Sequence, residues 1–373
     1  MTLDIDEILT HARSALASDV HIKTGGRLLF RVHGELVPQD QFPAISGTDA
    51  YALAKQITSE RELQGLSEVG SLDSSYGNQF NRYRVNVCAI SGDKEGQNIK
   101  MVIRVLPMQI PRPDELGLDT VLSDRSLVDS IITLERGLVL VTGVTGSGKS
   151  STIASLIDRI VDREPVHIIT LEQPPEYQFQ DRIGTISQRA VPYNTKTFAY
   201  GIRDAMRQDP DVIFVGEIRD QETSTAALQA AETGHLVFST VHSKNTGETV
   251  SRLVGFYPQN EHDQIRYNIA SNLEFVLAQQ LLPTRAKDGR VLAMEVFKTG
   301  NAARTYIRKG DEQTKLISYI QTNMKHGCIS MDESILRLYQ QGRISGEVAI
   351  EKAHDIQYMR ERIIQTSPLI DIQ

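Results

Sequence analysis

The sequence predicts an α/β protein built from two unequal domains, and three observations lead to this fold class. Fully apolar runs alternate with helical runs through the second part of the chain, as is typical of a parallel sheet covered on both faces. The first part mixes alternating strands with one helical run. A proline-rich segment separates the two parts, and a chain of 373 residues is long enough for two domains.

The first domain is expected over residues 1–106 as a small α+β unit. Alternating apolar residues predict strands at residues 28–32, 82–87 and 100–105. Helical periodicity predicts one helix at residues 50–63.

Residues 107–116 are predicted to be a linker. Pro107, Pro111 and Pro113 stand within seven residues of one another, which forbids a helix and favours an extended connector. The domain boundary is therefore placed at this segment.

The second domain is expected over residues 117–373. Its predicted strands lie at residues 138–142, 167–171, 212–215 and 236–241, and its predicted helices at residues 150–161 and 200–206. From about residue 259 the chain is expected to be mostly helical, ending in helices at residues 331–341 and 345–365.

Composition excludes several classes of protein. No apolar run reaches eighteen residues, so a cytoplasmic protein without a membrane anchor of its own is expected. The net charge of -7 argues against a surface built for nucleic acid or anionic lipid, and no nucleic-acid partner is expected. Cys88 and Cys328 show no C-x-x-C spacing, which predicts two reduced thiols and no zinc site.

Residues 143–150 match the phosphate-binding motif G-x-x-x-x-G-K-[ST] between a predicted strand and a predicted helix. Its glycines let backbone N–H groups turn toward phosphates, which the N-terminus of the following helix also attracts. Lys149 is expected to reach the β and γ phosphates and Ser150 to bind Mg²⁺, so the predicted cofactors are ATP and Mg²⁺. The predicted nucleotide-binding residues are Gly143, Thr145, Gly146, Ser147, Gly148, Lys149, Ser150 and Ser151.

Acidic residues follow two other predicted strands. Glu217 comes after residues 212–215 and is the candidate second contact to Mg²⁺, directly or through water. Glu172 ends the strand at residues 167–171, where an open α/β sheet binds its ligands, and is the candidate base for the attacking water. Glu176, which follows two prolines, is a second candidate for this base, but an ordinary surface acid explains it equally well.

Two histidines bracket the predicted strand at residues 236–241. His242 follows the carboxyl end and is the candidate sensor of the γ-phosphate. His235 precedes the strand and is equally well explained as a structural residue.

With these four elements in this order, the chain resembles the type II/IV secretion and pilus ATPases, most closely the PilT-like group that retracts type IV pili. The match extends almost from end to end. The segments that carry it are residues 17–22, 31–36, 82–86, 103–105, 203–220, 230–235 and 279–283.

The resemblance implies a PAS-like N-terminal domain and a RecA-like P-loop domain, assembled as a hexameric ring with ATP at subunit boundaries. It implies that Arg84, Arg104 and Arg203 reach the nucleotide, with Arg219 in the metal box as a weaker candidate. It also implies an inner-membrane pilus platform protein and a paralogous retraction ATPase as partners, which would hold this protein at the inner membrane.

The chain departs from the family pattern at Gln173 and Pro175, which usually read Asp and Ile. Glutamine cannot act as a base, so a weakly hydrolysing regulatory paralogue in a mixed complex stays open as an alternative. The four-cysteine zinc module of assembly and type II secretion members is absent, which favours retraction. Residues 302–308 match a retraction motif in part, and alone they read as a basic helix with a solvated face.

The leading hypothesis is a hexameric ATPase motor that retracts type IV pili in twitching motility. A Dot-type secretion ATPase shares all of these motifs and is the nearest alternative. A nucleic-acid translocase is disfavoured because Trp is absent and aromatic residues make up only 6% of the chain.

Overall fold

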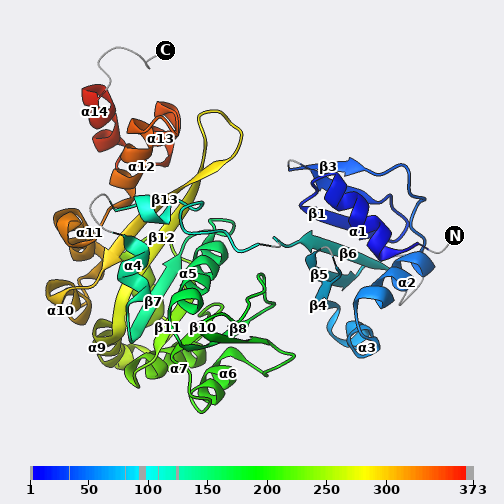
Figure 1. The fold of residues 1–373 in the computed structure, drawn as a ribbon, viewed down its shortest axis with the longest axis horizontal. Helices are drawn as coiled ribbons and strands as arrows, with labels where there is room; N and C mark the ends of the chain where they lie inside the picture. Colours follow the sequence, from blue (N-terminus) through cyan, green and yellow to red (C-terminus); the bar gives the residue numbers. More distant parts are fainter. Residues whose placement is uncertain are drawn as a thin grey trace. The chain divides into compact units, whose positions relative to one another are not determined.

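A computed structural model describes residues 3–32, 34–79, 81–91, 98–107, 109–122 and 126–366. The chain forms two compact units, one of Met1–Gln109 with Glu176–Gln178 and the other of Ile110–Pro175 with Phe179–Gln373 (Figure 1). Met108 of the predicted linker and His33 of one family segment lie outside the described residues.

The first unit is a six-stranded antiparallel sheet with helices on one face. Its strands are β1 (Asp19–Lys23), β2 (Leu29–Val32), β3 (Glu35–Pro38), β4 (Ser71–Gly77), β5 (Arg82–Ala89) and β6 (Ile99–Val105), in the order β3-β2-β1-β6-β5-β4. Its helices are α1 (Ile5–Ser14), α2 (Gly47–Ile57) and α3 (Glu60–Val69). Leu9 and Leu53 pack with Val20, Val85 and Ile103 in the core. The opposite face carries charged and polar side chains such as Arg84 and Arg104 together with a few apolar ones, such as Val102.

The three predicted strands of this unit are confirmed, but the single helix predicted at residues 50–63 is wrong. The chain breaks at Thr58, which is extended, and Ser59 starts α3. Ser59 and Glu62 form a reciprocal capping box, in which the Ser59 N–H donates to the Glu62 carboxylate at 2.6 Å. This cap satisfies the N–H groups of a new helix end, so two helices form where periodicity alone reads one.

The second unit contains a seven-stranded sheet. Its strands are β7 (Gly137–Thr142), β8 (His167–Glu172), β9 (Thr185–Ala190), β10 (Val212–Val215), β11 (Leu236–Val241), β12 (Leu273–Pro283) and β13 (Arg290–Lys298), in the order β13-β12-β7-β11-β10-β8-β9. All neighbours pair in parallel except β12 and β13. Every residue of β7, β10 and β11 is buried, which confirms the parallel α/β sheet predicted from apolar runs.

Helices connect these strands in the way the alternating pattern predicts. They are α4 (Leu127–Ile132), α5 (Lys149–Arg163), α6 (Phe198–Ala205), α7 (Gln221–Glu232), α8 (Thr246–Val254) and α9 (His262–Asn272). The predicted helices at residues 150–161 and 200–206 correspond to α5 and α6.

The expectation of a mostly helical chain from about residue 259 missed β12 and β13, which form a long hairpin. Leu273 to Ala278 pair in parallel with β7, so this apolar run is a central strand of the sheet. Beyond the hairpin lie α10 (Asn301–Lys309), α11 (Glu312–Thr322), α12 (Met331–Gln340), α13 (Gly346–Lys352) and α14 (Ile356–Thr366).

The last predicted helix, at residues 345–365, is two helices. Asp332 accepts hydrogen bonds from the N–H groups of His354 at 2.7 Å and Asp355 at 3.0 Å, which holds the break between α13 and α14. These helices and α12 pack on the end of the hairpin around Leu282 and Ile335 (Figure 1). Within the described ranges, no helix is both long and apolar enough to cross a bilayer.

Candidate functional site

Four neighbouring strands of the second unit end at one edge of the sheet, and each is followed by a predicted site segment. Residues 143–150 follow β7, His242 follows β11, Glu217 lies beyond β10, and Glu172 is the last residue of β8. The strands are parallel and adjacent, with Thr142 opposite Val241, so their carboxyl ends meet. The structure therefore brings these four segments together at the place where open α/β sheets bind ligands.

The loop of residues 143–150 requires its glycines. Gly143, Gly146 and Gly148 have φ angles of 146°, 79° and 91°, a region that side chains rarely tolerate. A Cβ atom on Gly143 would also lie 2.5 Å from the Ser147 hydroxyl and 2.6 Å from the Gln279 carbonyl. The Ser147 hydroxyl is buried and makes no hydrogen bond with any described residue. The result is a tight backbone cradle with an unsatisfied hydroxyl in its wall.

Lys149 begins α5 and its side chain lies over this loop. Its Nζ atom donates to the carbonyls of Gly143 at 2.9 Å and Val144 at 3.1 Å. Ser150 and Ser151, in the same first turn, are half-buried, while Thr145 is exposed. An ammonium group next to the positive end of a helix creates an attractive site for phosphate.

A chain of buried hydroxyl groups joins the loop to the segment that carries His242. The Thr142 hydroxyl donates to the Ser243 carbonyl at 2.8 Å and accepts from the Ser243 N–H at 3.1 Å. The Ser243 hydroxyl lies 2.5 Å from Thr142 Oγ1 and 2.7 Å from Thr249 Oγ1. These contacts extend the β7–β11 pairing by one step and fix His242 relative to the loop.

Glu217, Arg219 and His242 form a polar cluster at this edge. Arg219 forms an ion pair with Glu217, and His242 Nε2 lies 3.6 Å from Glu217 Oε2. Burial and the positive charges of Lys149, Arg252 and Arg219 lower the pKa of His242 below its usual value. His242 is therefore neutral at pH 7, with one ring nitrogen able to donate a hydrogen bond.

Glu172 is almost fully buried, and its carboxylate is held by neighbours. Thr170 Oγ1 donates to Glu172 Oε1 at 2.7 Å, and Gln188 Nε2 donates to the same oxygen at 3.1 Å. Sequence reasoning missed Gln188, because its role depends on the pairing of β8 with β9, a strand that was not predicted. The polar alternation of residues 185–190 was the available signal. Gln173, beside Glu172, is exposed.

The oxygen ligands at this edge suit a Mg²⁺ ion that arrives with a nucleotide better than a metal ion held by protein side chains alone. In the part of the chain that the structure describes, no group of three or more His, Cys, Asp or Glu side chains could hold a metal ion. The Ser150 hydroxyl and the Glu217 carboxylate offer oxygen atoms, and Mg²⁺ uses one or two such ligands together with phosphates and water. These residues therefore fit a magnesium ion that arrives with a nucleotide.

Three other predicted site residues lie elsewhere. His235 precedes β11 at the opposite edge of the sheet, where its Nδ1 atom is 2.9 Å from the Ala230 carbonyl. Arg203 is exposed in the last turn of α6. Glu176 follows β8 in the short segment that groups with the first unit.

The predicted arginines of the first unit share the open face of its sheet. Arg84 on β5 lies directly opposite Arg104 on β6, and Arg104 lies opposite Asp19 on β1. Arg104 Nε donates to Asp19 at 2.8 Å, while 60% of the Arg104 side chain remains exposed. Burial opposes ionisation of Asp19, but hydrogen bonds from Arg104 and Ser18 hold its pKa below the usual value.

A cavity of about 230 Å³ adjoins the phosphate loop. Gly148 and Thr152 of the loop and α5 form one wall, and Leu116 and Leu281 line it with apolar surface. Its lining also includes three arginines, among them Arg290, and the acids Asp114 and Glu115. The cavity thus places apolar surface and side chains of both charges next to the cradle.

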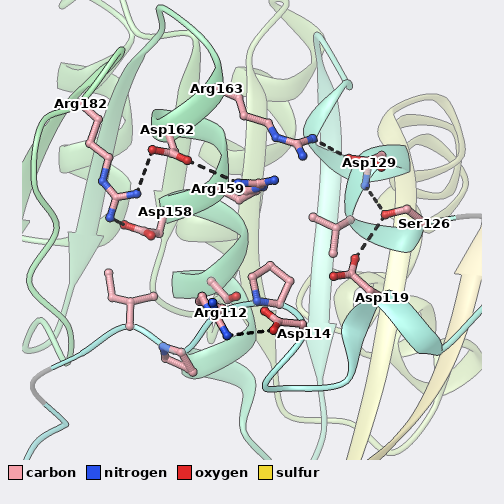
Figure 2. A pocket seen from close by; sticks show the side chains of 15 residues that line it. Arg112, Asp114, Asp119, Ser126, Asp129, Asp158, Arg159, Asp162, Arg163 and Arg182 are labelled. Atoms are coloured by element: carbon pink, nitrogen blue, oxygen red, sulfur yellow. Dashed lines mark hydrogen bonds and ion pairs between the residues drawn. The ribbon is translucent and has the colours of Figure 1, made fainter.

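A larger cavity, of about 670 Å³, lies at the other end of α5. Figure 2 shows that arginines and aspartates surround it, with Arg182 bridging Asp158 and Asp162 at 3.1 Å each. Arg163 pairs with Asp129 of α4 at 2.7 Å.

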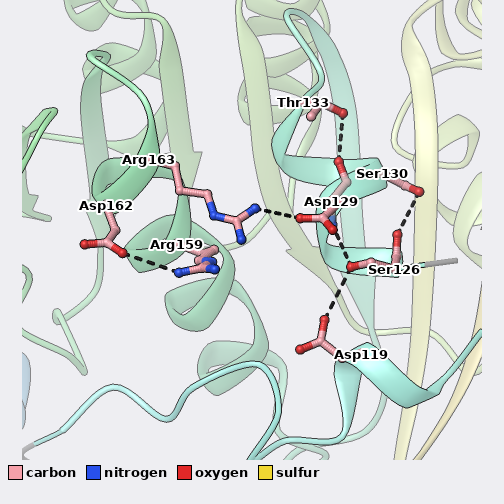
Figure 3. A network of polar contacts seen from close by, with 8 residues as sticks. All are labelled: Asp119, Ser126, Asp129, Ser130, Thr133, Arg159, Asp162 and Arg163. Carbon is pink, nitrogen blue, oxygen red and sulfur yellow. Dashed lines mark hydrogen bonds and ion pairs between the residues drawn. The ribbon is translucent and has the colours of Figure 1, made fainter.

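Hydrogen bonds continue this network along the cavity wall. The backbone N–H of Asp129 donates to the Ser126 hydroxyl, which donates to Asp119 (Figure 3). Exposed ion pairs contribute only about 0.2–1 kcal/mol each, but several of them act here on one end of α5. We interpret the network as an anchor for the far end of this helix, which begins with Lys149.

Comparisons with known proteins agree with this arrangement. A family model described as type II/IV secretion system protein matches residues 1–367. The chain belongs to this family. It is 34% identical over 352 residues to the type IV pilus retraction ATPase PilT of Pseudomonas aeruginosa, covering 94% of this chain and 98% of that protein. The resemblance drawn from the motifs is thereby confirmed.

Two solved structures of family members are similar over most of this chain. A crystal structure of the pilus retraction motor PilT with bound ADP has a TM-score of 0.85 and 39% identity, covering 96% of this chain and 99% of that one. The ATPase DotB of Legionella pneumophila has a TM-score of 0.78 and 29% identity, covering 92% and 93%.

Proposed function

We propose that this protein is an ATP-hydrolysing motor that drives the retraction of type IV pili. The observation that carries the ATPase assignment is the meeting of the phosphate cradle, His242, Glu217 and Glu172 at one edge of a parallel sheet. The similarity to PilT, which is named as a pilus retraction ATPase and motor, supports pilus retraction as the process that this hydrolysis drives.

In this proposal, residues 117–373 form a RecA-like P-loop domain, residues 1–106 a PAS-like domain, and residues 107–116 the linker. The strand, glycine loop and helix at residues 137–163 support the P-loop assignment. The six-stranded antiparallel sheet with helices on one face supports a separate N-terminal domain.

Each residue at the edge has a distinct role. MgATP supplies the phosphoanhydride bond that is cleaved and a divalent charge that neutralises its phosphates. Lys149 and the N–H groups of the glycine loop would hold the phosphates, and Ser150 with Glu217 would hold the metal. The cavity beside Gly148 would take the base and sugar, because its Leu116 and Leu281 walls offer apolar surface.

Glu172 is the proposed base. Its carboxylate, fixed by Thr170 and Gln188, accepts the proton of the attacking water. Neutral His242 donates a hydrogen bond toward the γ-phosphate without adding a charge. Glu176, His235, Arg203 and Arg219 remain secondary candidates.

Arg84 and Arg104 are proposed to act on the nucleotide of a neighbouring subunit in a homohexameric ring. Both stand on the open face of the first unit, and a short linker favours delivery across a subunit boundary. Arginine supplied in this way can be worth about 10³–10⁵ in turnover. The proposed partners are an inner-membrane pilus platform protein and a paralogous retraction ATPase, which place the protein on the cytoplasmic side of the inner membrane.

A Dot-type secretion ATPase is the second candidate, favoured by the similarity to DotB. Deletion of this protein in its own cells separates the two functions. Surplus surface pili together with lost twitching would support retraction. Normal piliation with failed export of proteins would contradict it.

A regulatory paralogue with little turnover is the third candidate, because Gln173 replaces the usual acid. Steady-state hydrolysis by the purified protein tests it. Turnover that depends on Glu172 supports the enzyme, whereas tight MgATP binding without turnover supports the regulator.

A further inference from the structure

We propose that Gln188 is a positioning residue, which orients the Glu172 carboxylate toward the attacking water. The inference rests on the proposed function, since it takes Glu172 as the base. It assigns a role to β9, a strand from which no site residue was predicted.

The pairing of β8 with β9 places three polar side chains on one face. Thr170 lies directly opposite Gln188 in the register, and Glu172 stands two residues beyond Thr170 on the same face of β8. Thr170 is fully buried and Glu172 is only 7% exposed, so the carboxylate depends on protein donors for its hydrogen bonds.

The orientation of the Gln188 amide is set by a second contact. The backbone N–H of Phe179 donates to Gln188 Oε1 at 3.1 Å. Since Oε1 is the acceptor, Nε2 must be the group that faces Glu172, which it reaches at 3.1 Å. Gln188 thereby links the base to the connection between β8 and β9.

Two donors on a single carboxylate oxygen restrict the carboxyl group. They fix its rotation, so Oε2 takes up a defined direction at the end of β8. Loss of Gln188 would remove one of the donors that hold the carboxyl group in this orientation.

The test is Gln188→Met, which keeps the length of the side chain and removes both polar atoms. We expect kcat for ATP hydrolysis to fall about tenfold while KM changes less than twofold, because positioning acts on the chemical step. Gln229→Met on the exposed surface of α7 is the matched control and should leave kcat unchanged.

A double-mutant cycle separates positioning from general stability. With Glu172→Gln already present, Gln188→Met should cause no further loss of turnover, since the group it orients is no longer a base. Equal losses in both backgrounds, in proteins with native circular dichroism, would overturn the role of Gln188. A wild-type kcat in Gln188→Met would overturn the positioning role of Gln188 and leave the base assignment intact. A wild-type kcat in Glu172→Gln would overturn both.

Discussion

The carboxyl edge of the second unit and the open sheet face of the first unit present their functional side chains in opposite ways. At the edge, parallel strands deliver Lys149, Glu172, Glu217 and His242 side by side, and polar contacts tie most of them to neighbours. On the open face, the Arg84 side chain makes no hydrogen bond or ion pair with another described residue, and the Arg104 side chain pairs with Asp19. An edge of parallel strands assembles a site within one unit, whereas exposed arginines on an antiparallel face can serve another molecule.

The largest effect is expected for Lys149→Ala, which should remove the phosphate site of the second unit. Lys149→Ala should abolish nucleotide binding and hydrolysis and leave the fold intact, since this side chain contacts loop carbonyls and not the apolar core. Nucleotide titration and circular dichroism measure the two properties together, with the exposed Lys309→Ala as the control. Normal turnover by a folded Lys149→Ala protein would remove the phosphate site from the second unit.

A smaller effect distinguishes the acids of the edge. Glu172→Gln should bind MgATP normally and hydrolyse it at least about tenfold more slowly, a rise of about 1.4 kcal/mol in the barrier. Glu217→Gln should in addition weaken the dependence on Mg²⁺. Steady-state rates across a magnesium titration test both, and unchanged turnover in Glu172→Gln would move the search for the base to Glu176.

The hydroxyl chain that couples the loop to His242 should have a more modest effect. Ser243→Ala removes the hydroxyl that contacts both Thr142 and Thr249, and each such hydrogen bond is worth about 1 kcal/mol, so we expect turnover to fall about fivefold or more. Ser224→Ala is the matched control, because the Ser224 hydroxyl is equally buried and has no hydrogen-bond partner among the described residues. Equal rates in the two variants would show that the chain does not position His242.

The smallest effect concerns pH. Folding lowers the pKa of His242, so the folded protein binds fewer protons at this residue than the unfolded chain does. The free energy of unfolding should therefore fall as the pH drops below about 6.5. Denaturant unfolding at pH 7.5 and 5.5 should therefore show a smaller loss in His242→Gln than in the wild-type protein. An identical loss in both proteins would assign the pH dependence to other groups.

The second unit was more predictable from sequence than the first for a physical reason. Fully buried strands such as β7 and β11 read as apolar runs, and residues 143–150 carry a motif whose glycines the backbone requires. Strand β3 is exposed throughout, β1 and β4 mix buried with less buried residues, and none of the three was predicted.

Two features depended on long-range pairing and could not be read locally. Strand β12 is apolar enough to fit a buried helix, and only its pairing with β7 decides the matter. Gln188 meets Glu172 through the register of β8 and β9.

Residues 302–308 were predicted to be a helix with a solvated face, but Arg304 donates to the carbonyls of Ala270 and Ser271 and pairs with Glu274.

The most direct test of the account is complementation between the two regions in mixed assemblies. Lys149→Ala lacks the phosphate site, and Arg104→Ala lacks the arginine, so each protein alone should be inactive. If the arginine of one subunit serves the nucleotide of the next, mixing the two variants creates boundaries with both groups intact, and partial ATP hydrolysis should return. A mixture that stays inactive, although mixed assemblies demonstrably form, would contradict the claim that the first unit completes the site of another copy.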